Sequence, residues 1–124
     1  MKVNIKESVA RARELFTSGY NCAQSVFIAY RDLADMDEQT AATISAPFGG
    51  GMGRLREVCG AVSGMTMCAG YIAPNTYPND NANKKLCYST VQALAERFRE
   101  ENGAIVCREL LGLAQRKDDP TPSA

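Results

Sequence analysis

Apolar side chains recur every three or four residues along most of this 124-residue chain. That spacing is typical of amphipathic helices, and no segment alternates as a strand would. The first helix is predicted over residues 4–18, because Ile5, Val9, Ala12 and Phe16 share one helical face, and Gly19 is its expected C-terminal cap. The chain is therefore predicted to be all-α, a small helical bundle of about five to six helices.

The next two helices are predicted from their capping residues. Asn21 is the expected N-cap of a second helix that runs to about Ala34. Asp35, followed three residues later by Glu38, resembles a capping box and predicts a short third helix that ends near Pro47.

Three further helices are predicted in the second half of the chain. A helix of small residues is expected over about residues 57–73, and a short last helix over 105–114. Between them lies a long, charge-rich helix that ends near residues 102–103, with a buried stripe formed by Cys87, Val91, Leu94 and Phe98.

Length and composition indicate one globular domain, over residues 1–116, followed by a flexible tail over 117–124. The 14 basic and 14 acidic side chains balance, so no long-range field attracts nucleic acid or an anionic membrane. The longest uncharged stretch, residues 58–79, is interrupted by glycine, proline and asparagine, which argues against a membrane span. The start has no signal-peptide core, so a cytoplasmic location with mostly reduced cysteines is expected.

The chain has five cysteines and no histidine. The absence of histidine excludes Cys-His nucleophile pairs, histidine-containing zinc sites and imidazole acid–base catalysis within the chain. An odd number of cysteines also excludes a fully paired disulfide scaffold within one chain. Thiols are therefore the main reactive groups that remain.

Three cysteines fall at predicted helix starts. Cys22 follows the N-cap Asn21, Cys59 lies in the first turn of the small-residue helix, and Cys107 opens the last helix. Free backbone amides and the helix dipole favour a thiolate at such positions. By contrast, Cys68 and Cys87 lie within predicted helices and are expected to be packing residues.

Glycines surround Cys59 on both sides. Gly60 and Gly64 lie four residues apart, which favours close approach of another helix, or alternatively access of a ligand or partner thiol to Cys59. The run of residues 49–53, followed by Arg54 and Arg56, lacks the ending of a P-loop. A tight structural loop that positions Cys59 is therefore preferred to a phosphate-binding cradle.

Four blocks of the chain resemble the C_GCAxxG_C_C family of redox-active proteins. They are Gly19–Gln24, Phe48–Gly53, Cys59–Gly64 and Cys107–Gly112, in the expected order. The combination extends over nearly the whole chain and is far more specific than any one block. The resemblance implies a small, cysteine-dependent protein with a redox role, and it does not fix a substrate.

Matched residue by residue, the resemblance implies that Cys22, Cys59 and Cys107 are the family cysteines. It also implies a further cysteine shortly after the Cys107 block, and no cysteine follows Cys107 in this sequence. A site of four cysteines would then need Cys68 or Cys87, a ligand from a partner chain, or a longer sequence.

Three hypotheses follow. In the first, the protein is a thiol-dependent oxidoreductase in which Cys59 or Cys22 is the reactive thiolate and another of the three resolves it as a disulfide. Cys59 is preferred because it combines a helix start, nearby arginines and small neighbours. The partner would be an unidentified redox protein or small molecule.

In the second hypothesis, Cys22, Cys59 and Cys107 bind zinc or an iron–sulfur cluster, with a fourth ligand that is exogenous or comes from the other subunit of a homodimer. In the third, the protein is a helical interaction module with structural cysteines. Wide separation of the three cysteines would favour the third.

Overall fold

The computed structural model describes residues 5–112. Helices joined by turns and loops make up most of this range. In chain order they are α1 (Ile5–Thr17), α2 (Cys22–Ala29), η1 (Arg31–Ala34), α3 (Glu38–Ser45), η2 (Ala46–Phe48), α4 (Gly49–Met52), α5 (Gly60–Ile72), α6 (Asn81–Asn102) and α7 (Cys107–Leu110). Five of these described helices have eight residues or more. The predicted all-α bundle is confirmed.

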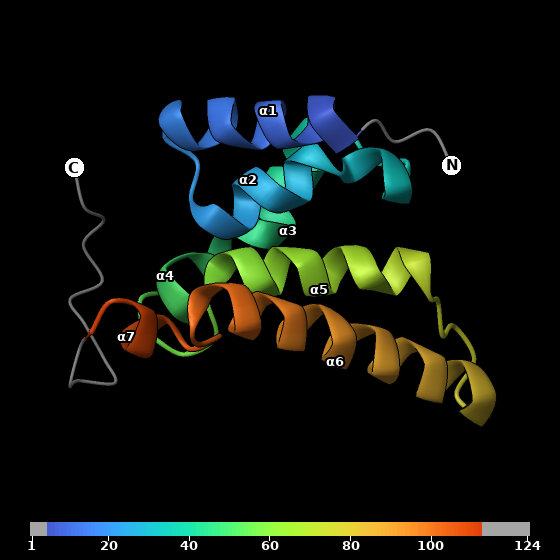
Figure 1. Cartoon of the computed structure of the whole chain (residues 1–124). Helices are drawn as coiled ribbons and strands as arrows, with labels where there is room; N and C mark the ends of the chain where they lie inside the picture. Colours follow the sequence, from blue (N-terminus) through green and yellow to red (C-terminus); the bar gives the residue numbers. More distant parts are fainter. Residues whose placement is uncertain (1–4, 113–124) are drawn as a thin grey trace.

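Helix α2 is the centre of the bundle. It contacts α1 on one side, α3 on another and α5 on a third, and α5 in turn contacts α6 (Figure 1). Helices α2 and α5 both begin at the end of the molecule where α4 and α7 lie, and α6 runs back toward that end. This topology brings the starts of three helices together.

The hydrophobic core lies around α2. Its buried members come from four helices and are Leu15, Phe27, Ile28, Ala29, Ala41 and Cys68. The predicted packing role of Cys68 is therefore confirmed, since its side chain is buried within this cluster.

The predicted first helix is present as α1, but its apolar face is only partly covered. Leu15 and Ser8 are the buried residues of this helix, whereas Ile5 is 70% exposed and Phe16 is 56% exposed. Periodicity identifies the apolar face of a helix, but the neighbouring helices determine whether that face is covered. Here Leu15 enters the core, and the predicted face lies at its edge.

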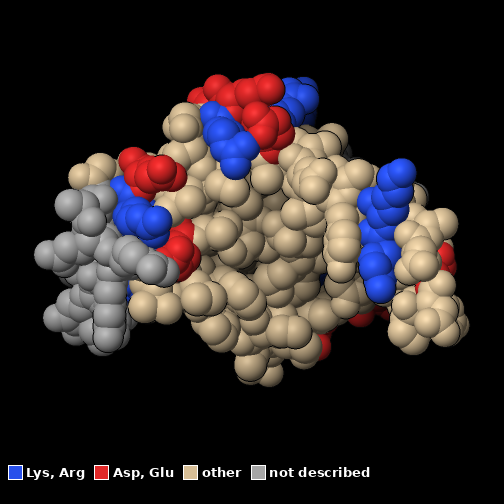
Figure 2. Space-filling model, turned by 90° about the horizontal axis from the view of Figure 1, so that it is seen from below, with Lys and Arg blue, Asp and Glu red and all other residues tan. Residues whose placement is uncertain are grey.

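The predicted stripe of α6 is only partly buried. Cys87, Val91, Leu94 and Phe98 share one side of the helix, and each is half-buried because α6 packs mainly on α5. No residue of α6 is fully buried. The face seen from below in Figure 2 is largely uncharged, with basic and acidic side chains toward its edges.

Several helix boundaries differ from the prediction. The second helix ends at Ala29, and a separate 3-10 turn follows. The third helix has Asp37 as its N-cap, because Asp35 adopts a left-handed conformation at the end of η1. The last helix spans only Cys107–Leu110. Residues 113–116 and the predicted tail 117–124 lie outside the described residues, so the domain limits stay a prediction.

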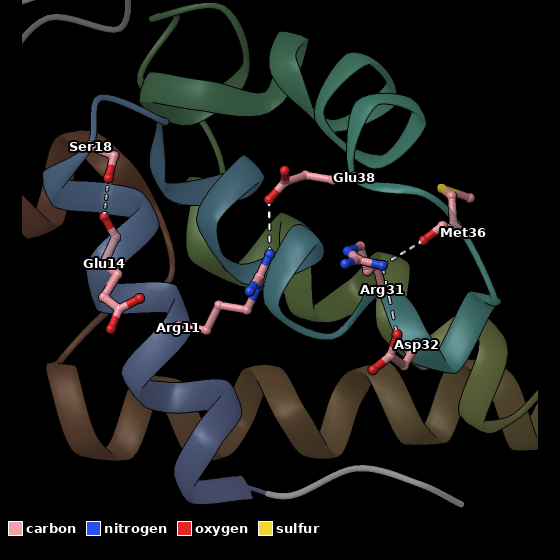
Figure 3. Close-up of polar contacts among 7 residues, drawn as sticks. All are labelled: Arg11, Glu14, Ser18, Arg31, Asp32, Met36 and Glu38. Atoms are coloured by element: carbon pink, nitrogen blue, oxygen red, sulfur yellow. Dashed lines mark hydrogen bonds and ion pairs between the residues drawn. The ribbon is translucent and has the colours of Figure 1, made fainter.

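Side-chain contacts join the N-terminal helices (Figure 3). Arg11 of α1 donates to Glu38 of α3 at 2.9 Å. Arg31 donates to the Met36 carbonyl at 3.2 Å and lies 3.8 Å from the Asp32 carboxylate, which closes the turn between η1 and α3.

Candidate functional site

Cys22, Cys59 and Cys107 lie at the same end of the bundle. Cys22 is the first residue of α2, Cys59 is the N-cap of α5, and Cys107 is the first residue of α7. The predicted place of Cys59 in the first turn of α5 is thus wrong by one position. Electrostatic interaction with Cys59 and with Cys107 raises the pKa of the Cys22 thiol, so the two side chains lie near Cys22.

Cys22 is positioned by a capping box. The Asn21 side chain accepts from the Gln24 backbone N–H at 2.9 Å, and the Gln24 side chain accepts from the Asn21 backbone N–H at 3.0 Å. The Asn21 amide also donates to the Ala46 carbonyl at 3.0 Å. A Cβ on Gly49 would lie 2.3 Å from the Asn21 side-chain nitrogen, so the space that seats Asn21 depends on that glycine.

Cys59 is held between two backbone contacts. Its N–H donates to the Ile105 carbonyl at 2.8 Å, and its own carbonyl accepts from Ser63 in the first turn of α5. The next residue, Gly60, packs directly on α2, where an added Cβ would lie 3.3 Å from the Cys22 Cβ. Gly60 therefore allows the starts of α2 and α5 to approach.

Gly64 continues this close contact one turn further along α5. A Cβ there would lie 2.9 Å from the Val26 Cβ and 3.0 Å from the Ala23 carbonyl oxygen of α2. Both glycines thus face the α2 backbone. This supports the packing interpretation of the small-residue pattern over the alternative of an open approach for a ligand.

Cys107 is fixed by the segment that precedes Cys59. Its N–H donates to the Glu57 carbonyl at 2.5 Å, and Val58 forms an isolated antiparallel bridge with Val106. The buried Arg56 guanidinium donates to the Cys107 sulfur at 3.6 Å. A positive charge therefore lies beside this buried sulfur.

The glycine-rich run, residues 49–53, packs against Cys107. Gly50 and Gly51 have positive φ angles of 65° and 74°, so the segment labelled α4 is a tight turn and not a regular helix. A Cβ on Gly51 would lie 2.7 Å from the Cys107 Cβ. Arg54 and Arg56 also adopt left-handed conformations, which non-glycine residues seldom do. This run packs directly on Cys107, and it reaches Cys22 through Asn21.

Burial raises the pKa of the Cys22 thiol above its ordinary value. Electrostatic interaction with Cys59 and, to a smaller extent, with Cys107 raises that pKa further, while a backbone hydrogen bond opposes this effect. The expectation that a helix start lowers the pKa is therefore wrong for Cys22. Burial and the neighbouring thiols outweigh the backbone hydrogen bond, the one cause that lowers the pKa there.

Cys68 and Cys87 lie far along their helices from this end. Cys68 is nine residues beyond Cys59 on α5, about 13 Å at the rise of an α-helix. Cys87 is fifteen residues before the C-terminal end of α6, about 22 Å away along the axis. Neither replaces a fourth cysteine at the site.

The metal hypothesis finds no geometric support in residues 5–112. No group of three or more cysteine, aspartate or glutamate side chains in that part of the chain is arranged to hold a metal ion. All five cysteines are free thiols. The three-cysteine group is therefore close enough for electrostatic coupling but is not arranged as a metal centre.

The comparison with protein families matches residues 20–123 to the model described as "Putative redox-active protein (C_GCAxxG_C_C)". The chain belongs to this family. The match begins just before Cys22 and includes all five cysteines, so the C_GCAxxG_C_C assignment covers Cys22, Cys59 and Cys107. The comparison with curated proteins gave no match, and neither did the comparison with solved structures.

Sequence reasoning missed two features of this C_GCAxxG_C_C site. The Asn21–Gln24 capping box could have been found from the spacing of the two side chains. The contact between Arg56 and Cys107 joins residues 51 positions apart, and nothing local predicts it. The Asn21 and Gln24 side chains, which flank Cys22, are used in helix capping. Within residues 5–112, no helix combines the length and the hydropathy needed to cross a membrane.

Proposed function

We propose that this C_GCAxxG_C_C protein carries out thiol–disulfide exchange, with Cys59 as the nucleophile and Cys22 as the resolving cysteine. The observation that supports this pair most directly is the coupling of the two thiols. Among the charged groups that raise the pKa of Cys22, Cys59 has the largest effect. The geometry agrees, because a Cβ on Gly60, the residue after Cys59, would lie 3.3 Å from the Cys22 Cβ, so the two thiols are candidates for a shared disulfide.

The division of roles follows from burial and from charge. The raised pKa of Cys22 keeps it a neutral thiol at neutral pH, which makes it a poor first nucleophile. Cys107 is buried, with 9% of its surface exposed, so a partner disulfide reaches it poorly. Cys59 is half-buried at the N-terminus of a 13-residue helix and remains the best candidate for the first attack.

The proposed reaction reduces a disulfide on a partner molecule. The Cys59 thiolate attacks one partner sulfur, the partner S–S bond breaks, and a mixed disulfide forms with release of one partner thiolate. That thiolate takes up the Cys22 proton. The Cys22 sulfur then attacks the Cys59 sulfur and releases the second partner thiolate. The partner disulfide gains two electrons, and the two cysteines lose them.

Cys107 is assigned a positioning role. Its contacts with Glu57 and Arg56 fix the short segment that leads into Cys59. The proposal therefore predicts that the three cysteines differ in function, although all three match the family pattern.

The test is a trapping experiment with oxidised glutathione at pH 7. The reduced protein is expected to form an intramolecular Cys22–Cys59 disulfide, identified by peptide mass mapping and reversed by dithiothreitol. Cys22→Ser should accumulate a mixed disulfide between glutathione and Cys59. Cys59→Ser should form neither product.

Cys87→Ser is the matched control, since Cys87 is also half-buried but lies far from the site. It should behave as the wild type does. Equal mixed-disulfide formation in Cys59→Ser and in Cys22→Ser would contradict the assigned roles. A disulfide that includes Cys68 in the folded protein would contradict the proposed site.

A further inference from the structure

A groove of about 580 Å³ lies between α1, α2, α5 and α6. Its lining is almost entirely apolar and includes Val9, Val26, Met65, Ile72 and Leu94. None of the three site cysteines contributes to it. This volume falls within the range of roughly 300–1,000 Å³ that is usual for small-molecule sites.

The apolar face of α1 forms one lip of this groove. Ile5 and Val9 line it and remain 70% and 42% exposed, and Ile72 at the end of α5 is 52% exposed. Ile5 and Val9 belong to the apolar face of the amphipathic helix α1. A ligand with an apolar body would cover the surface that the core leaves open.

Charge narrows the choice of ligand. Arg13 is the one charged residue among those that line the groove, and within residues 5–112 it forms no ion pair. Tyr30 adds a hydroxyl to the same lining. The groove thus combines a long apolar surface with a single cation, which complements an amphiphile that carries one negative charge.

We propose that this groove binds a long-chain carboxylate, with the acyl chain against α5 and α6 and the carboxylate at Arg13. A second copy of the chain fits less well. Antiparallel pairing of two α1 helices across the groove would bring their Arg13 edges together, and Lys6 lies on the same edge, seven residues away. Like charges would then face each other at the contact.

The probe is dodecanoate, titrated into the reduced full-length protein below its micellar concentration and followed by calorimetry. One molecule is expected to bind per chain. Dodecyltrimethylammonium, which has the same chain length and the opposite charge, should bind more weakly. Arg13→Ala should weaken dodecanoate binding about two- to fivefold, as expected for one exposed ion pair, without weakening the ammonium probe.

Lys85→Ala is the matched control, because Lys85 is an exposed cation on α6 that does not line this groove. It should leave dodecanoate binding unchanged. Two groove variants, Val9→Asp and Ala12→Phe, should each reduce binding at least tenfold while circular dichroism shows a retained helical fold. Val9 is 42% exposed and is not among the buried core residues, so its substitution tests the groove with little risk to folding.

Three results would overturn the proposal. The first is no dodecanoate binding below the micellar concentration, and the second is binding that survives both groove variants. The third is a wild-type dimer that Val9→Asp converts to a monomer, which would identify a second copy as the occupant. Because binding does not use Cys22 or Cys59, Cys22→Ser should bind dodecanoate normally, and failure here leaves the proposed exchange reaction unaffected.

Discussion

Single residues show how burial separates two kinds of cysteine in this protein. Cys68 is buried in the core, and burial alone raises its pKa from 9.0 to about 11. Cys22 is affected by burial and also by two neighbouring thiols. The Cys68 sulfur therefore only packs in the core, whereas the pKa of the Cys22 thiol also depends on neighbouring cysteines.

The raised pKa of Cys68 predicts a loss of stability at alkaline pH. The folded protein keeps the Cys68 proton up to about pH 11, whereas the unfolded chain loses it near pH 9. The unfolded state therefore binds fewer protons in this window, and the free energy of unfolding falls as pH rises from 9 to 11. The expected contribution is at most roughly 2–3 kcal/mol.

Urea unfolding at pH 8, 9, 10 and 11, in the presence of a reducing phosphine, measures this contribution. Cys68→Ala serves as the comparison, because it lacks the titrating group but keeps every other one. The wild type should lose more stability than Cys68→Ala between pH 9 and 11. If stability falls equally with pH in the two proteins, ionisation of Cys68 is not the cause of the loss.

At the level of elements, the closeness of α2 and α5 depends on Gly60 and Gly64. Glycine inside a helix costs about 1 kcal/mol relative to alanine, so an exposed glycine should gain stability on replacement. Gly64→Ala would instead place a Cβ 2.9 Å from Val26, which forces the two helices apart. We expect Gly64→Ala to lower the free energy of unfolding by about 1–3 kcal/mol.

Gly70→Ala is the matched control on the same helix. Nothing lies within 4 Å of a Cβ built at Gly70, so this variant should be unchanged or up to about 1 kcal/mol more stable. Chemical denaturation of both variants gives the comparison. Similar effects at the two positions would mean that the α2–α5 contact tolerates an added methyl group.

How far the sequence predicts the structure depends on whether the relevant contacts are local. The start of α2 follows from Asn21, whose side chain accepts a hydrogen bond from the Gln24 backbone N–H three residues ahead. The rotation of α1 does not follow from its own periodicity, because Leu15 and the neighbouring helices determine which side is buried. Periodicity likewise locates the α6 stripe but not its half-buried state.

The sequence nominates the three cysteines of the candidate site but does not predict how they are brought together. Helix-start positions and the family pattern both select Cys22, Cys59 and Cys107. Their convergence depends on α2 and α5 starting at the same end of the bundle and on the return of α6 to that end (Figure 1). The Arg56–Cys107 contact depends on the same long-range arrangement, which no local spacing encodes.

For the molecule as a whole, the proposed disulfide would join two helix starts 37 positions apart in sequence. A cross-link over a loop of that length restricts the unfolded chain and stabilises the folded state by up to about 4 kcal/mol, less any strain in the folded state. We therefore expect the oxidised wild type to unfold at a higher urea concentration than the reduced wild type.

Cys107→Ser and Cys22→Ser show which disulfide produces the higher stability of the oxidised protein. Cys107→Ser should keep most of the oxidation-dependent increase, because the Cys22–Cys59 bond can still form. Cys22→Ser should lose it. The measurement is urea denaturation of each protein before and after oxidation, with the disulfide assigned by peptide mass mapping. An increase that persists in Cys22→Ser would assign the stabilising bond to Cys59 and Cys107, and the resolving role would then pass from Cys22 to Cys107.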